Sequence, residues 1–353
     1  MKNIISAILF VMLASMAWGA PVNTLSTFAT KQNRPAKNIG NSNQKGVNPV
    51  NNSPKKSSSP LSNIIPITTL NYKKANDQGV PQYEPCTATR LTSNLLFTAA
   101  HCLVGGLTHG SRIQVELLTT EDGKEGLFLS KPREDSLFQT NAQVFVYKPQ
   151  YTQPGDLIPP FDFGVVVLDK TVKFNPKSVK KMLKQTSMMP LFGNQMEALI
   201  QQKAQQKFVQ KSMEYTKFLN RKLEEVSLLV MRPEGVEEEL QGRKLYAYRW
   251  GGEQYDPVRY PLETWTLTGK GTGAPQDSHT MLFSGAEFQG GISGSPIFDT
   301  ERKFVISLAI GVVGGLDAGG LIEQAVCDWV RQYDSNVACV VRHDGVVANE
   351  QEG

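Results

Sequence analysis

The first 76 residues of the chain contain nine basic residues and no Asp or Glu. Between about residues 20 and 62 they are mainly Asn, Ser, Lys, Pro and Gly, without clusters of aliphatic side chains. A segment of this composition buries too little apolar surface to offset the entropy that folding removes. We therefore expect residues 20–62 to form a disordered basic arm, either a pro-segment or a tether, and the folded part to begin near residue 63.

The charge of the chain divides at the same place. The 353 residues carry a formal net charge of +4, but removing the nine basic residues of that stretch leaves 28 basic against 33 acidic residues. The remaining part is therefore mildly acidic, with a net charge of −5. A nucleic-acid partner, which a basic chain would suggest, loses its support.

The N-terminus has the pattern of an export signal. Lys2 precedes an apolar stretch from residue 4 to 14, and small residues follow in Ala17-Trp18-Gly19-Ala20. We expect residues 1–19 to be a signal peptide of bacterial type and the protein to be secreted or periplasmic; an uncleaved anchor is the alternative. No later apolar stretch is long enough to span a bilayer.

Export makes disulfides available to the four cysteines, Cys86, Cys102, Cys327 and Cys339. Four cysteines allow three connectivities, and the spacing alone does not choose among them. Even with His101 beside Cys102, the spacing matches no tetrahedral zinc set, so we expect no metal and no cofactor.

The stretch Gly290–Phe298 reads Gly-Gly-Ile-Ser-Gly-Ser-Pro-Ile-Phe and places Ser293 among glycines. A serine hydroxyl is a useful nucleophile only when a tight turn holds it beside a base and backbone N–H groups face the developing oxyanion. Gly291 and Gly294 permit such a turn. Taken alone, the stretch also fits a simple loop between two strands.

Two further stretches supply the partners that a nucleophilic serine needs. Leu95–Cys102 is an apolar strand that runs into small residues and delivers His101, whose imidazole suits proton transfer near neutral pH. Phe161–Leu168 places Asp162 at the head of a Val-rich strand, a rigid apolar setting for a carboxylate that orients the histidine. Asp156, in the preceding loop, is the competing carboxylate.

With His101, Asp162 and Ser293 in this order, the chain resembles the chymotrypsin (trypsin-like) clan of serine peptidases. The resemblance covers roughly residues 64–175 and 225–335, and Gly-Ser-Pro after Ser293 is similar to bacterial exported members of glutamyl endopeptidase type. It implies a mostly β fold with two antiparallel six-stranded Greek-key barrels. It also implies that the three residues form a catalytic triad.

The resemblance assigns further residues. The backbone N–H groups of Gly291 and Ser293 would form the oxyanion hole, and the sixteen-residue separation of Cys86 and Cys102 matches a disulfide of the clan. Counting back six residues from Ser293 reaches Glu287, where trypsin-like members carry the acid that selects Lys or Arg. An exposed loop glutamate is the alternative reading of Glu287.

The chain departs from the family pattern before the nucleophile and between the barrels. Ile292 stands where digestive members carry an acid that pairs with a new N-terminus, so that mode of activation is in doubt. Apolar residues mostly four apart from Met196 to Val226, with a shorter helical stretch from Ser178 to Met188, predict an inserted helical hairpin. This insertion would bind a partner, gate the substrate or brace the body.

The stretch Gly319–Tyr333 resembles the helix that closes the second barrel in the family, and the remaining cysteines, Cys327 and Cys339, would then pair. The predicted organisation is a signal peptide (1–19), the basic arm (20–62), the N-terminal barrel (63–175), the helical insertion (176–225), and the C-terminal barrel with closing helix and tail (226–353).

The expected function is that of a serine endopeptidase that hydrolyses peptide bonds through an acyl-enzyme, with a preference for Lys or Arg at the cleaved position. The expected partner is a protein or peptide substrate, with a further protein partner at the insertion, and with no nucleic acid and no stable membrane span. The alternative is an inactive protein of the protease fold that binds through its helical insertion.

Overall fold

The computed structural model describes residues 60–75, 81–104, 107–119, 125–133, 136, 138–148, 161–175, 177–178, 193–232, 245–251, 256–262, 264–267, 280–284, 291–299, 304–313, 316–343 and 346–349. They belong to one compact unit, Ser58–Gly251 with Tyr255–Gly353. The predicted signal peptide and all of the predicted arm before Pro60 lie outside the described residues. Pro60–Asn63 forms a 3₁₀ turn that leads into the first strand.

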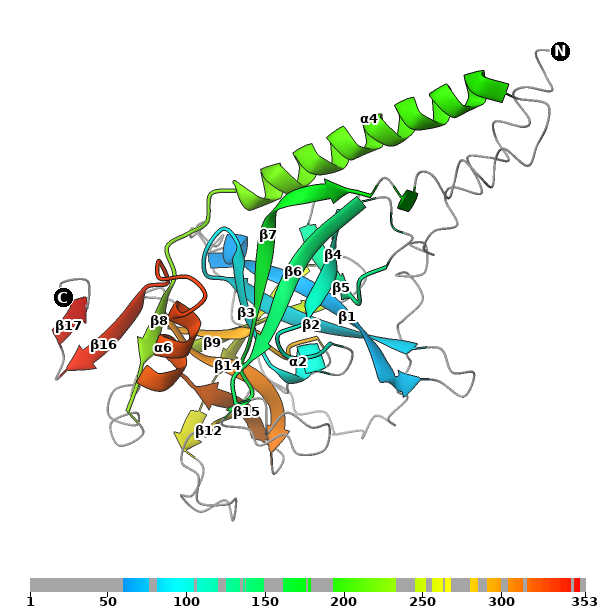
Figure 1. Ribbon diagram of the computed structural model, residues 1–353. Coiled ribbons are helices and arrows are strands. Elements are labelled where there is room, and N and C mark those ends of the chain that lie inside the picture. The colour runs from blue at the N-terminus through cyan, green and yellow to red at the C-terminus, as the bar shows by residue number, and fades with distance from the viewer. Residues whose placement is uncertain are drawn as a thin grey trace, which may run out of the picture. The chain divides into compact units, whose positions relative to one another are not determined.

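Seven strands close into the first barrel (Figure 1): β1 (Ile64–Ala75), β2 (Pro81–Arg90), β3 (Leu95–Thr98), β4 (Arg112–Thr119), β5 (Glu125–Ser130), β6 (Phe138–Val146) and β7 (Gly164–Phe174). Their spatial order is β1-β2-β3-β7-β6-β4-β5. The barrel closes where β1 pairs with β5 in parallel, with Ile67 opposite Leu127.

This barrel differs in detail from the predicted six antiparallel strands, since it has seven strands and one parallel pair. β1 has twelve residues and pairs with β2 on one edge and β5 on the other. Such pairing joins residues about 60 positions apart, and the local alternation of side chains does not report it.

Ten strands form the second sheet: β8 (Ser227–Val230), β9 (Leu245–Gly251), β10 (Asp256–Leu262), β11 (Thr264–Leu267), β12 (Thr280–Ser284), β13 (Pro296–Asp299), β14 (Phe304–Val313), β15 (Leu316–Leu321), β16 (Cys339–His343) and β17 (Val346–Asn349). The main path is β10-β9-β13-β14-β15-β12-β11, and β8 adds to β14 and β16 in parallel. Within the described residues this path does not close, so the second six-stranded barrel appears as a larger sheet.

The apolar run of β3 and β7 serves two hydrophobic cores. Leu96 and Val166 point into the first barrel, whereas Phe97 and Val165 point into a second core between this barrel and the other sheet. Because both faces of these strands are buried, their sequences read as continuous apolar stretches rather than alternating ones. The segments that carry His101 and Asp162 therefore adjoin two strands that are buried on both faces.

The inserted helix α4 spans Gly193–Leu219, and 27 residues at 1.5 Å each make it about 40 Å long. It lies against β7 (Figure 1), and Tyr215, Phe218 and Leu219 enter the core of the first barrel. The other arm of the predicted hairpin, 178–188, lies outside the described residues apart from Ser178.

α4 ends earlier than the apolar spacing predicts, because two buried polar side chains bind the chain there. Arg90, at the end of β2, donates from its guanidinium to the carbonyls of Phe218 (3.0 Å) and Leu219 (3.2 Å). Asn63 then accepts the N–H of Glu224 at 2.9 Å and donates to its carbonyl at 3.0 Å. Residues 220–226 are therefore not helical.

The closing helix α6 spans Gln324–Arg331, which is shorter than the predicted stretch from Gly319 to Tyr333. Gly319 and Gly320 belong to β15 instead, where both pair with β14 and β12. The disulfide Cys327–Cys339 joins α6 to β16. This is the connectivity that the family resemblance implies.

Candidate active site

Asp162 and His101 form the polar centre of the site. The Asp162 carboxylate, just before β7, is buried with 3% of its side chain exposed, and its Oδ2 lies 2.5 Å from Nδ1 of His101. Its other oxygen, Oδ1, accepts the backbone N–H of His101 at 2.8 Å. Both oxygens thus hold one residue, and the contact at Nδ1 selects the tautomer whose Nε2 can accept a proton.

His101 opens the short helix α2 (His101–Val104), which approaches the start of β7 closely. Gly164 makes this approach feasible, because a Cβ at that position would lie 2.7 Å from Cδ1 of Leu103 and 3.3 Å from Cα of Ala100. The backbone N–H of Ala100 also donates to the Asp162 carbonyl at 3.2 Å. The acid and the histidine are therefore fixed by backbone packing as well as by their own hydrogen bonds.

The loop from Gly291 to Ser295 makes the tight turn that its glycines predict. Gly291 and Gly294 have φ values of 94° and 78°, a region that favours glycine. The N–H of Ser295 donates to the carbonyl of Ile292 at 2.8 Å, so the chain turns around Ser293. Ile292 itself is buried in the core of the second sheet, which explains why an apolar residue stands before Ser293.

The serine loop is fastened to the first barrel by Thr87, the residue after Cys86. The N–H of Thr87 donates to the Ser293 carbonyl at 2.8 Å, and its hydroxyl donates to the Gly291 carbonyl at 2.7 Å. A Cβ on Gly294 would lie 2.8 Å from the backbone nitrogen of Ala99. These contacts bring Ser293 next to the segment that carries His101, almost 200 residues earlier in the chain.

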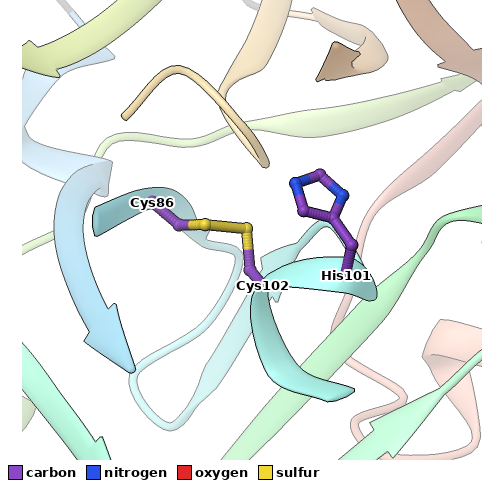
Figure 2. Close-up of side chains that lie close together, drawn as sticks. All are labelled: Cys86, His101 and Cys102. Atoms are coloured by element: carbon purple, nitrogen blue, oxygen red, sulfur yellow. A yellow bond between two sulfur atoms is a disulfide. The ribbon is translucent and has the colours of Figure 1, made fainter. Parts of the chain in front are cut away.

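The disulfide Cys86–Cys102 lies next to the His101 ring (Figure 2). Cys102 Sγ is 3.6 Å from the Ser293 carbonyl oxygen. Cys86, Cys102 and His101 are close enough to suggest a metal site. However, the two sulfurs are bonded to each other and offer no thiolate ligands, so these three residues do not form one.

Three consecutive backbone donors at Ser293 have no hydrogen-bond acceptor among the residues that the structure describes, the N–H groups of Gly291, Ile292 and Ser293. The neighbouring N–H groups of Gly294 and Ser295 do have one, the carbonyls of Ala309 and Ile292. Gly291 and Ser293, two of the three, are the residues whose N–H groups the resemblance assigns to the oxyanion hole.

Two of the predicted residues, Glu287 and the competing carboxylate Asp156, lie outside the described residues. Sequence reasoning missed Thr87, whose only local signal is its position after Cys86. It also missed Asp317, a buried carboxylate on β15 that lies opposite Phe283 of β12 in the strand register.

Comparisons with known proteins find likeness in structure only. No family model matches the chain, and no curated protein matches it. Among solved structures, it is similar to a Glu endopeptidase (11% identity, 78% of this chain and 91% of that chain, TM-score 0.38) and to an inactivated protease paralogue of the scabies mite (12%, 78% and 94%, 0.41). It is also similar to the HtrA-type protease AlgW (11%, 79% and 67%, 0.37).

These neighbours are trypsin- and chymotrypsin-like proteases, the group that the three motifs resemble. At such identities and TM-scores the likeness carries no argument about activity, substrate or partners.

Among the described residues, no helix is both long enough and apolar enough to cross a membrane.

Proposed function

We propose that this chain is a secreted or periplasmic serine endopeptidase with His101, Asp162 and Ser293 as its catalytic triad. The observation that carries the proposal is the junction made by Thr87. It holds the Ser293 loop beside the segment in which Asp162 orients His101. The same loop carries the N–H groups of Gly291 and Ser293, which have no acceptor among the described residues.

The first half of the reaction forms an acyl-enzyme. Ser293 Oγ attacks the carbonyl carbon of the scissile peptide bond while Nε2 of His101 accepts its proton. The N–H groups of Gly291 and Ser293 donate to the oxyanion of the tetrahedral intermediate. As the C–N bond breaks, His101 returns the proton to the leaving amine.

The second half releases the acid product. Water attacks the ester carbonyl, His101 takes a proton from this water, and collapse of the second intermediate returns the proton to Ser293 Oγ. Throughout, the buried Asp162 carboxylate stabilises the imidazolium and keeps its orientation.

Labelling with a fluorophosphonate tests the triad directly, because the reagent reacts with an activated serine. We expect an adduct on Ser293 in protein that begins near residue 20, as located by mass spectrometry of its peptides. Ser293→Ala and His101→Ala should abolish the adduct, whereas Ser335→Ala, at an exposed serine after α6, should leave it unchanged. A folded wild-type protein without an adduct on Ser293 contradicts the proposal.

We further propose a preference for Lys or Arg at the cleaved position, set by a carboxylate in the C-terminal part of the chain. Glu287 is the candidate from the resemblance. Asp317 is a second candidate, because it is 5% exposed and lies two residues from Gly319, which pairs with Ala309 beside the nucleophile loop.

Cleavage profiles of a peptide library decide between the two carboxylates. We expect at least about tenfold preference for Lys or Arg in the wild type. Loss of this preference in Glu287→Gln or in Asp317→Asn, with labelling of Ser293 retained, identifies the residue responsible. A wild type without the preference, or one whose preference survives both substitutions, contradicts the specificity proposal and leaves the triad untouched.

The second candidate function is that of an inactive protein of the protease fold that binds a partner through α4. The observation in its favour is the exposure of two apolar side chains on that helix, Val209 (50%) and Met213 (67%). The intact Asp162–His101 pair argues against it. The labelling experiment separates the two, since the inactive protein forms no adduct.

Secretion or a periplasmic location rests on the N-terminal pattern and on the two disulfides, which persist in oxidising compartments. Expression of the full chain with its leader, followed by N-terminal sequencing of the exported protein, tests this part. A new N-terminus at Ala20 is expected, and retention of Met1 on protein inside the cell contradicts it.

A further inference from the structure

The residue after the acid, Phe163, has a fixed backbone and a fully buried ring. Its N–H donates to the Phe161 carbonyl and its carbonyl accepts the N–H of Tyr147, both at 2.8 Å. Its ring stacks on Phe97, with 5.7 Å between the centroids and 7° between the planes. Phe97 lies on β3, the strand that leads to His101. The ring pair therefore joins the segment that carries Asp162 to the segment that carries His101.

The tip of the Phe163 ring rests on the backbone of Gly320 in β15, across the boundary between barrel and sheet. A Cβ at Gly320 would lie 2.8 Å from Cζ, 3.3 Å from Cε1 and 3.4 Å from Cε2 of Phe163. No real Cβ tolerates the first distance, so the ring or the strand would have to move. Because Gly320 has no side chain, the Phe163 ring can pack directly against the backbone of β15.

Gly320 is itself held firmly. Its carbonyl accepts the hydroxyl of the buried Ser307 at 2.7 Å, and in the register of β14 and β15 it lies opposite Leu308. The next residue of β14, Ala309, exchanges backbone hydrogen bonds with the serine loop, to Ser295 at 2.8 Å and from Gly294 at 2.7 Å. One strand pair therefore carries both the Ser293 loop and the surface on which Phe163 rests.

We propose that Gly320 and Phe163 are positioning residues of the site: their contact sets the depth of Asp162 and thereby the position of His101 relative to Ser293. The inference rests on the proposed peptidase function. It explains why these two residues, 157 positions apart, meet with no gap for a methyl group. Neither residue touches the reacting atoms.

Gly320→Ala is the direct test, and its added methyl group should push Phe163 and Asp162 away from the second sheet. We expect kcat to fall about 10- to 100-fold with KM within twofold, since misplacement of a catalytic group by about 1 Å has effects of this size. A weaker carboxylate contact also stabilises the imidazolium less, so the acid limb of the pH–rate profile should move to lower pH.

Shortening the ring should restore the geometry. In Gly320→Ala/Phe163→Leu the leucine lacks the atoms that the new methyl would meet, and we expect at least fivefold recovery of kcat over Gly320→Ala. Gly126→Ala is the matched control. Its Cβ would meet Cγ of Pro66 at 2.9 Å in the first barrel, so it should lower stability without changing kcat or the pH profile.

A proton NMR signal gives a reading that does not need activity. The Nδ1 proton shared by His101 and Asp162 resonates far downfield, and we expect Gly320→Ala to shift or lose this signal while Gly126→Ala retains it. If Gly320→Ala does not fold, Phe163→Leu alone, which removes the ring contact without a clash, should also shift the signal.

The outcomes separate the two proposals. Wild-type protein that shows the downfield signal but no fluorophosphonate adduct contradicts the peptidase function and still leaves the positioning contact measurable. Unchanged kcat and an unchanged signal in Gly320→Ala overturn the positioning role. A loss of kcat that Phe163→Leu does not recover also overturns it, since the effect would then come from elsewhere in β15.

Discussion

His101 and Asp162 are joined by two hydrogen bonds of the Asp162 carboxylate in addition to backbone contacts, whereas Ser293, in the turn before β13, is held through its backbone. The acid reaches the histidine through contacts of 2.5 and 2.8 Å. Around Ser293, by contrast, the bonds join main-chain groups to Thr87, Ala309 and Ile292. The serine hydroxyl is thus presented by a loop whose shape does not depend on that hydroxyl.

The two regions should therefore respond differently to substitutions. A substitution of the Asp162 carboxylate alters both of its hydrogen bonds to His101 at once and leaves the backbone contacts of the strand in place. The serine loop instead depends on glycine conformations and on the neighbours that bind its carbonyls. Substitutions around Ser293 should therefore act through geometry, and with smaller effects.

Asp162→Asn should have the largest effect on the region held by side chains. The amide cannot accept both N–H groups of His101 as the carboxylate does, so the ring is held in the wrong tautomer, and we expect kcat to fall about 10⁴-fold. The control is Asp169→Asn on β7, whose carboxylate makes only a 3.9 Å contact with Lys173. Steady-state kinetics on a cleaved peptide measures both, and a fall of less than tenfold in Asp162→Asn contradicts the role of the acid.

Thr87→Val should have an intermediate effect, on the region held by backbone. The variant keeps the shape of the side chain but loses the hydroxyl that donates to Gly291, and an unsatisfied buried carbonyl costs about 1–3 kcal/mol. We expect kcat/KM to fall about tenfold as the loop relaxes.

Thr89→Val, two residues along the same strand, is its matched control. The Thr89 hydroxyl is buried without a hydrogen-bond partner among the described residues, so removing it should leave activity unchanged and slightly raise stability. Equal kcat/KM values for the two variants would show that the hydroxyl of Thr87 does not hold the loop.

The three residues of the proposed triad lie in three short strings that the sequence shows locally. Each of His101, Asp162 and Ser293 follows or opens an apolar strand, and their order along the chain suffices for the resemblance. The structure joins the first two directly and brings the loop of the third beside them. The apolar spacing of α4 is likewise a local signal, since Ile200, Ala204, Tyr215 and Leu219 are buried on one side of the helix.

Contacts between distant segments carry no such signal. Nothing near Arg90 indicates that it ends a helix almost 130 residues later, and nothing near Gly320 indicates a ring from the other half of the chain. The parallel closure of β1 on β5 belongs to the same class. Gly319 and Gly320 belong to this class too, because their pairing with β14 and β12 keeps them in a strand although the resemblance places the start of the closing helix there.

Arg90→Met should lower stability rather than activity. It therefore tests the framework of the first barrel independently of His101 and Asp162. Burial lowers the pKa of Arg90 to about 10, so it remains charged at neutral pH and caps the negative end of α4. Losing these bonds leaves the Phe218 and Leu219 carbonyls unsatisfied, and we expect a loss of about 2–4 kcal/mol in urea unfolding.

Arg221→Met is the comparison for this substitution, since Arg221 makes a half-exposed ion pair with Glu125 at 3.1 Å and should contribute less than about 1 kcal/mol. Both variants should keep kcat within twofold. An Arg90→Met variant as stable as Arg221→Met would mean that the buried guanidinium does not hold the end of the helix.

The smallest effect should come from Asp334, which ties the turn after β2 to the segment after α6. Burial opposes its ionisation, but hydrogen bonds from Thr92 (2.7 Å) and Asn336 prevail and lower the pKa of Asp334 below 3.8. Because the folded pKa is the lower one, this stabilisation is fully present above about pH 4 and is lost as the pH falls through the folded value. Thr92→Val should therefore lower stability slightly at pH 6 and by less near pH 2. Urea unfolding at both pH values measures the loss of stability in Thr92→Val. A loss that is equally large at pH 2 would show that Thr92 acts through packing and not through the charge of Asp334.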